Sequence, residues 1–219
     1  MRILNTILDF VFPSVCLSCG KGGVDLCLEC LSDSPVAERE SAKWIFPLFD
    51  YRHPPIKKAV WLLKYSSKRR LAKIFAEALY FRILEELAEL EVMENFRQPI
   101  LIPIPLSKKR QRERGFNQAE LICRELIKLD TGKNFTLAEN VLIKPKDTEH
   151  QARIEDRGKR LKNLIGSFAV KNSKEIQTIK DRNIILIDDV TTTGATLNEA
   201  KKTLKLAGAR KVIAFAVAH

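Results

Sequence analysis

Two adjacent carboxylates, Asp188 and Asp189, follow four aliphatic residues in the stretch IILIDDVTTTGAT, residues 184–196. Adjacent carboxylates can accept hydrogen bonds from neighbouring hydroxyl groups. The backbone N–H groups of a Thr/Gly run before a helix can surround a phosphate. These residue types in this order predict a site for a ligand that carries both hydroxyls and a phosphate, such as a ribose 5-phosphate.

Four cysteines form a second group with chemical potential. In CLSCGKGGVDLCLEC, two Cys-x2-Cys pairs are separated by seven residues. Four thiolates brought together in this way form a closed, structural zinc site. The predicted ligands are Cys16, Cys19, Cys27 and Cys30. Two disulfides or four free thiols are the alternatives, but the chain has no evident secretory signal, which favours zinc and a cytoplasmic location.

The positive charge is concentrated in three stretches. The formal net charge is +11 over 219 residues. Residues 57–73 carry seven basic and no acidic groups, residues 107–114 five and one, and residues 144–163 seven and four. Such concentration indicates anionic partners, namely phosphates, nucleic acid or a membrane surface.

The stretch SKKRQRERGFNQ is predicted to be a loop that opens at the same sheet edge as Asp188. Arginine is suited to a diphosphate because its planar guanidinium binds phosphate through two N–H groups. The diphosphate candidates are Arg110, Arg114 and Gly115. Asn117 has helix capping as an equal alternative. Lys108, Lys109 and Arg112 have a solvated surface as theirs.

The segment HQARIEDRGKRLKN, residues 150–163, lies between two predicted strands. It is either an exposed helix with internal ion pairs or a loop that closes over the ligand. In the second case, its candidates for diphosphate contact are Gln151, Arg153, Arg157 and Arg160.

Aromatic and basic residues alternate in KKAVWLLKYSSKRR. Trp61 and Tyr65 are four residues apart on one helical face, which is typical of a core. The same mixture is typical of a groove that stacks the bases of single-stranded nucleic acid. The candidates for nucleic-acid contact are Lys64, Lys68, Arg69, Arg70, Lys108, Lys109 and Arg110.

Unbroken aliphatic strands alternate with amphipathic helices, which predicts an α/β fold with a parallel sheet covered on both faces. Strands are expected at residues 44–51, 98–105, 140–145, 166–170, 182–190 and 211–218, and helices at 54–65, 68–93, 117–129 and 196–208. We expect residues 1–42 to form a small module and residues 43–219 the main domain. Residues 3–12 form an apolar helical face that packs on the body or makes weak peripheral membrane contact. Cys123 lies in an apolar helical pattern and is expected in the core.

The stretch IILIDDVTTTGAT resembles the 5-phosphoribosyl-1-pyrophosphate (PRPP) motif of type I phosphoribosyltransferases. The tetracysteine cluster, LKY (63–65), PIP (103–105) before a basic stretch, RGFNQ (114–118) and the QAR segment (from 151) follow in an order that resembles the ComF family. This resemblance implies a zinc-ribbon module before a type I phosphoribosyltransferase domain. It also implies a part in natural competence, the uptake of DNA by transformation.

The resemblance further implies a role for each residue of the motif. Asp188 and Asp189 would bind the ribose hydroxyls, Arg114 would act on the diphosphate with Mg²⁺, and the loop would hold the 5′-phosphate. The residues of this loop are Thr191, Thr192, Thr193, Gly194, Ala195 and Thr196. Thr192 stands where 6-oxopurine phosphoribosyltransferases have an aspartate, so ordinary purine salvage is doubtful. A single-stranded DNA-binding module with a vestigial or regulatory PRPP site, and a nucleobase salvage enzyme of nucleoside metabolism, are the alternatives.

Overall fold

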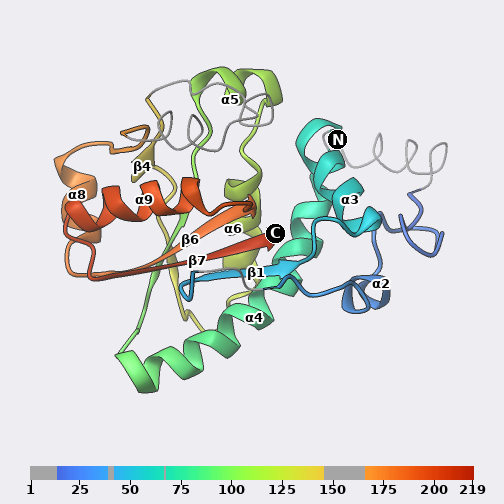
Figure 1. Cartoon of the computed structure of the whole chain (residues 1–219), viewed down its shortest axis with the longest axis horizontal. Helices are drawn as coiled ribbons and strands as arrows, with labels where there is room; N and C mark the ends of the chain where they lie inside the picture. Colours follow the sequence, from blue (N-terminus) through green and yellow to red (C-terminus); the bar gives the residue numbers. More distant parts are fainter. Residues whose placement is uncertain (1–13, 39–41, 67, 146–165) are drawn as a thin grey trace.

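A computed structural model describes residues 14–38, 42–66, 68–145 and 166–219 (Figure 1). In chain order the elements are α2 (Leu28–Ser32), β1 (Ile45–Phe49), α3 (Pro54–Tyr65), α4 (Arg70–Glu94), β2 (Ile100–Pro103), α5 (Lys108–Arg114), α6 (Gln118–Leu129), β3 (Thr136–Leu137), β4 (Leu142–Ile143), β5 (Ala169–Val170), α8 (Ser173–Ile179), β6 (Asn183–Val190), α9 (Ala195–Leu206) and β7 (Lys211–Ala218). The helix predicted for residues 3–12 and the segment 150–163 lie outside the described residues.

Five parallel strands form the central sheet in the order β1-β7-β6-β2-β3. The two longest strands, β6 and β7, lie side by side from Asn183 opposite Lys211 to Val190 opposite Ala218. Their aliphatic side chains are buried on both faces, as expected for a parallel sheet between layers of helices. The predicted α/β fold is therefore confirmed.

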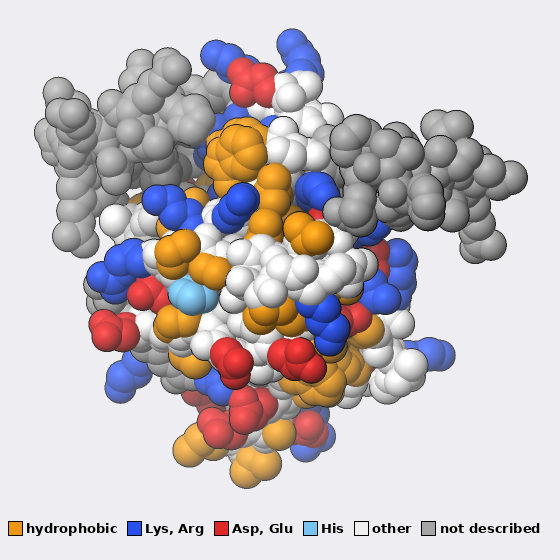
Figure 2. Space-filling view, turned by 90° about the vertical axis from the view of Figure 1, so that its right-hand side faces the viewer, with side chains coloured by type: hydrophobic (Ala, Val, Ile, Leu, Met, Phe, Trp, Pro, Cys, Tyr) orange, Lys and Arg blue, Asp and Glu red, His pale blue; other side chains and the backbone are white. Residues whose placement is uncertain are grey.

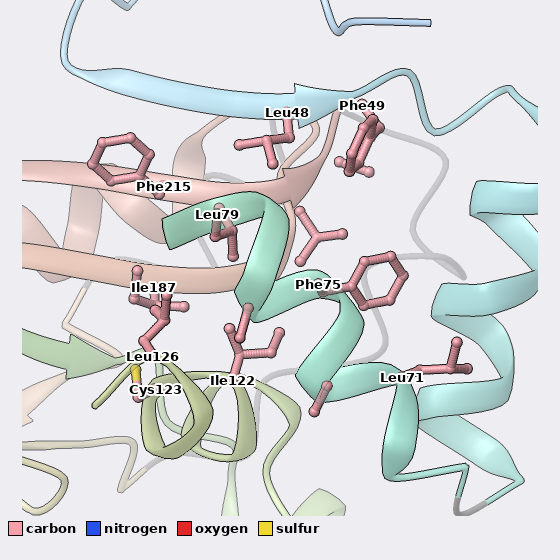
Figure 3. Close-up of a cluster of buried hydrophobic side chains, with 14 of the residues drawn as sticks. Leu48, Phe49, Leu71, Phe75, Leu79, Ile122, Cys123, Leu126, Ile187 and Phe215 are labelled. Atoms are coloured by element: carbon pink, nitrogen blue, oxygen red, sulfur yellow. The ribbon is translucent and has the colours of Figure 1, made fainter. Parts of the chain in front are cut away.

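Helices cover both faces of the sheet. On one face α4 and α6 pack their apolar sides against β6 and β7, in the cluster that Figure 3 shows. The apolar residues of α6 recur at helical spacing: Ala119, Ile122, Cys123 and Leu126. On the opposite face α8 and α9 contribute Ile179, Leu197, Ala200 and Leu204 to a second apolar cluster. Cys123 is fully buried, as predicted.

The cysteine-containing segment packs onto the same core as the sheet. Leu26 and Leu31 belong to the apolar cluster that contains Leu48 and Phe49 of β1. The N–H of Ala37 donates to the carbonyl of Leu48 at 2.9 Å, so the segment also extends the backbone pairing of β1. Within the described residues, the segment before β1 and the sheet therefore share one apolar core.

Several sequence predictions about local structure were wrong. Residues 108–114 form helix α5 rather than a loop, because Lys, Arg, Gln and Glu favour helix and Ser107 caps its first turn. The strands predicted at 140–145 and 166–170 shrink to the antiparallel pair β4 and β5, outside the main sheet. Strand β3 and helix α8 were not predicted. Among the described helices, none is both long and apolar enough to cross a membrane.

Candidate phosphate and hydroxyl site

The two acids lie at the carboxyl end of β6, as the sequence predicts. They line a cavity of about 500 Å³ between the ends of β6 and β2 and the helices α3, α5 and α6. Its lining includes Lys64, Tyr65, Arg110, Arg114, Asp188 and Asp189. In open parallel sheets a ligand binds at the carboxyl ends of the strands.

Lys64 pairs with the second acid inside this cavity. Its Nζ lies 2.9 Å from Oδ1 of Asp189, and the two side chains are only 17% and 13% exposed. Burial lowers the pKa of Lys64, but the negative charges of Asp189 and Asp188 outweigh burial and raise it above its ordinary value. Lys64 therefore stays charged and compensates one carboxylate.

Asp188 is in a different electrostatic position from its neighbour. Burial raises the pKa of Asp188 to about 7, and the adjacent charge of Asp189 adds to the increase. The charge of Lys64 and a hydrogen bond from the N–H of Asp189, at 2.8 Å, act in the opposite direction. The surroundings therefore hold this carboxyl near half-ionisation at neutral pH, and a ligand that donates hydrogen bonds would favour the ionised form.

The threonine loop leads from β6 into α9, but its residues are used unequally. Thr192 and Thr196 line the cavity. Thr191 is buried, and its N–H donates to the carbonyl of Ala218 at 2.9 Å, so this amide is engaged by β7. Gly194 precedes the helix with a φ of 69°, a backbone conformation that residues other than glycine rarely adopt. The N-terminus of α9 adds N–H groups and a positive dipole end to this side of the cavity.

Arg110 and Arg114 reach the same cavity from α5. Gly115 ends α5 with a φ of 74°, so its role is to turn the chain toward α6. Asn117 caps α6 by accepting from the N–H of Ala119 at 3.1 Å, which confirms the capping alternative. Lys108, Lys109 and Arg112 are exposed.

Three predicted nucleic-acid candidates lie outside the cavity and make other contacts. Lys68 donates to Oδ1 of Asp25 at 2.7 Å, and Arg70 donates to Oγ of Ser14 at 3.1 Å. The guanidinium of Arg69 lies 4.8 Å from the ring centroid of Phe116. The turn between α3 and α4 therefore joins the cysteine segment to the start of α6. Arg153 and Arg157 lie outside the described residues.

Lys64, Gln118 and Lys144 also line the cavity, although sequence reasoning did not assign them to it. Lys64 was predicted only as a nucleic-acid contact. One signal was present for it: a single lysine within the apolar run WLLKY has to reach a polar partner if the helix packs on the body. Gln118 belongs to the RGFNQ motif, but its role was not recognised.

The four cysteines lie together as predicted. Their Sγ atoms are all within 4.8 Å of one another, and Cys27 Sγ lies 3.7 Å from both Cys16 Sγ and Cys19 Sγ. Four sulfurs around a tetrahedral zinc at about 2.3 Å are separated by about 3.8 Å, so the cluster fits such an ion. Gly20 and Gly23 have φ values of 76° and 87° and allow the tight turns around the sulfurs.

The cavity therefore combines groups suited to a ligand that carries both hydroxyls and phosphates. Two carboxylates can accept from hydroxyls, the end of α9 with Thr192 and Thr196 can hold a phosphate, and two arginines can hold further phosphate charge. With both acids ionised, Lys64, Arg110, Arg114 and Lys144 leave the lining net positive.

Comparison with known sequences identifies relatives that match between about half and most of this chain. No protein-family model matches. The competence protein F of Haemophilus influenzae is 27% identical over 209 residues, which cover 92% of this chain and 84% of that protein. The competence protein ComFC of Bacillus subtilis is 40% identical over 105 residues, 48% of this chain and 38% of that protein. The DNA utilization protein YhgH of Escherichia coli is 26% identical, covering 85% and 74% of the two chains.

Comparison with solved structures finds hypoxanthine phosphoribosyltransferases. A ternary substrates complex of the Trypanosoma cruzi enzyme is 12% identical, covers 68% of this chain and 67% of its own, and has a TM-score of 0.39. A further crystal structure of the enzyme from the same organism has a TM-score of 0.37 at 11% identity, covering 68% and 66% of the two chains.

Proposed function

We propose that this chain, a homologue of the competence proteins F and ComFC, is a PRPP-binding phosphoribosyltransferase-like protein that acts in DNA uptake. One observation carries the first half of the proposal: Asp188 and Asp189 line one cavity with Thr192, Thr196, Arg110 and Arg114. The names of the relatives support the second half. The motif that carries the cavity is the one whose sequence resembles a PRPP site.

Each group has a part in the proposed complex. Asp188 and Asp189 accept hydrogen bonds from the 2′- and 3′-hydroxyls of the ribose. The amides at the start of α9 and the hydroxyls of Thr192 and Thr196 hold the 5′-phosphate. Arg110 and Arg114 bind the diphosphate, where negative charge develops if the bond to the ribose breaks. Mg²⁺, a cation that prefers oxygen ligands, would bind through the diphosphate.

We propose that zinc occupies the four-cysteine cluster and that its role is structural. All four sulfurs belong to the protein, so a tetrahedral ion there has no open coordination position for a substrate. Thiolate ligands require a reducing compartment, which agrees with a location in the cytoplasm.

The proposed test is a calorimetric titration of PRPP with Mg²⁺ into the zinc-loaded protein and into Asp188→Asn. We expect saturable binding to the wild type and loss of at least tenfold in affinity in the variant. The reason is that a neutral amide accepts a hydrogen bond from a ribose hydroxyl more weakly than a carboxylate does. Asp33→Asn, at an exposed acid of the cysteine segment, is the matched control. The absence of binding to the folded wild type would refute the proposal.

Single-stranded DNA binding is the second candidate. The observation that favours it is that Trp61 and Tyr65 are exposed among basic residues, which is the composition of a stacking groove. If DNA binding is independent of the PRPP site, Asp188→Asn should leave DNA affinity unchanged. Neutralising Arg69 and Lys58, both exposed, should then weaken it and reduce its salt dependence.

A further inference from the structure

Helix α4 has apolar residues on two opposite faces. Its inward face belongs to the core, as Figure 3 shows for Leu71, Phe75 and Leu79. Phe81 and Val92 lie on the outward face and are 72% and 87% exposed. A helix that is apolar on two faces needs a second surface to pack on, in addition to the core of its own domain.

The outward residues recur at the spacing of a coiled-coil seam. Six positions follow one another at intervals of four, three, four, three and four residues, which keeps them on one side of the helix. We call them the outer stripe of α4, and they are Ile74, Ala78, Phe81, Glu85, Ala88 and Val92. Ile74 and Ala78 are half-buried, and the other four are exposed. At 1.5 Å per residue, the outer stripe is about 27 Å long.

The outer stripe is complementary to itself when two copies of α4 run in opposite directions. A two-fold axis at residue 83, the middle of the stripe, brings its residues into three pairs that each occur twice. The pairs are Ile74 with Val92, Ala78 with Ala88, and Phe81 with Glu85. The two alanines have the smallest side chains of the stripe, so the helices can approach to about 8 Å. The methylene groups of Glu85 can cover part of the Phe81 ring.

The charge along α4 also favours two antiparallel copies. Residues 70–82 carry three basic groups and one acidic group, whereas residues 83–94 carry five acidic groups and no basic one. In an antiparallel pair, the positive half of each helix lies beside the negative half of the other. A parallel pair would instead place the acidic groups of both copies side by side.

A cavity lies beside the first turns of the outer stripe. Its volume is about 780 Å³, and its lining includes Ile74 of α4 and Val24 and Leu28 of the cysteine segment. The opposite end of α4 carries Val92 and Met93, which are 87% and 81% exposed, and it projects below the sheet in Figure 1. At the same level in Figure 2, hydrophobic side chains lie next to acidic ones. In an antiparallel pair, this projecting end of one copy reaches the cavity of the other, and the contact occurs twice.

We propose that the outer stripe of α4 is the interface of a homodimer, in which the α4 helices of two copies pack antiparallel about a two-fold axis. The interface is separate from the proposed PRPP site, because no described residue that lines the cavity of Asp188 belongs to α4. Each dimer therefore presents two such cavities. The dimer goes beyond the function proposed above and forms without PRPP.

Sedimentation velocity of the zinc-loaded full chain at increasing protein concentration tests the dimer. We expect the mean mass to rise from the 25.0 kDa of one chain to twice that value. Val92→Asp removes the apolar contact with Ile74 at both ends of the dimer. Because the change acts twice, it should weaken association by about a hundredfold. Leu206→Asp, at a residue near the end of α9 that is 81% exposed, is the matched control and should leave association unchanged.

Cysteine cross-linking tests the register of the two helices. Ala78→Cys and Ala88→Cys would be prepared as separate variants, mixed and oxidised, with the wild type as the control for the native cysteines. We expect a disulfide-linked dimer from the mixture and none from either variant alone. In the antiparallel pair, residue 78 of one copy faces residue 88 of the other. The two residues 78 are about 15 Å apart along the helix axis, which is too far for a disulfide.

The homodimer is supported if Val92→Asp alone reduces the mass and only the mixture cross-links. A mass of one chain at every concentration would overturn it, and the outer stripe would then belong to another occupant, either residues 1–13 of the same chain or an amphipathic helix of a different protein. Equal association of Val92→Asp and Leu206→Asp would overturn it as well. Cross-linking of each single variant with itself, or none in the mixture, would refute the antiparallel register.

Discussion

Replacing Asp188 by asparagine should stabilise the protein while it weakens PRPP binding at least tenfold. In the wild type, burial and the adjacent Asp189 raise the pKa of Asp188 from an ordinary value of about 3.9 to about 7. An acid whose pKa is raised on folding binds its proton more tightly in the folded state than in the unfolded state. Its ionisation therefore opposes folding at any pH above its unfolded pKa, and the cost grows with pH until the folded pKa is passed.

The size of the effect follows from the shift in pKa. About three pH units correspond to about 4 kcal/mol above pH 7, at 1.36 kcal/mol per unit. Between pH 5 and pH 7 the cost grows by about 2.3 kcal/mol, and above pH 7 it levels off. The carboxyl is partly open to the cavity, so we expect about half of these values. Asparagine can still accept the 2.8 Å hydrogen bond from the N–H of Asp189.

Urea denaturation of zinc-loaded wild type and Asp188→Asn, without PRPP or Mg²⁺, measures the difference in free energy of unfolding. The variant should be more stable by about 2 kcal/mol at pH 8 and by clearly less at pH 5. Comparing the two proteins at each pH cancels the titration of all other groups. A gain in stability that is the same at both pH values, or a loss of stability at pH 8, would refute the raised pKa assigned to Asp188.

Two further substitutions test the ion pairs around the site. Lys64→Met removes the cation 2.9 Å from Asp189, which should raise the pKa of Asp188 further. PRPP affinity should therefore fall strongly at pH 7 and recover at pH 9. An equal loss of affinity at both pH values, measured by calorimetry, would contradict this. Asp25→Asn weakens the 2.7 Å contact with Lys68 at a carboxyl that is 5% exposed. Urea denaturation should show a free energy of unfolding that is lower by about 1–3 kcal/mol. The double variant with Lys68→Met should show little further loss.

The parts of the site that are contiguous in sequence could be predicted. Asp188, Asp189 and the threonine loop follow a strand directly, so their common position at the sheet edge follows from the strand alone. The cysteines lie within fifteen residues and need only two tight turns. Lys64, Arg114 and Gln118 reach the same cavity from three different helices, and their meeting depends on how those helices pack.

Other errors came from patterns with two physical outcomes. Trp61 and Tyr65 have the spacing of a buried helical face, but both side chains line the cavity and are about half exposed. The stretch 108–114 was predicted to be a loop because of its charge, although Lys, Arg, Gln and Glu are strong helix formers. The two-residue strands β4 and β5 carry too few residues for a pattern to distinguish them from loops.

The turn between α3 and α4 has a consequence for how this protein can be altered. Lys68 and Arg70 face the cysteine segment, Arg69 faces Phe116, and Lys64 lies in the cavity a few residues earlier. The region around this turn thus contacts both the cysteine segment and the cavity. In addition, Leu26 and Leu31 of the cysteine segment belong to the apolar core beneath the sheet. The cysteine segment is therefore not a portable unit. Removing it, or exchanging it for that of a relative, would require compensating changes along this turn.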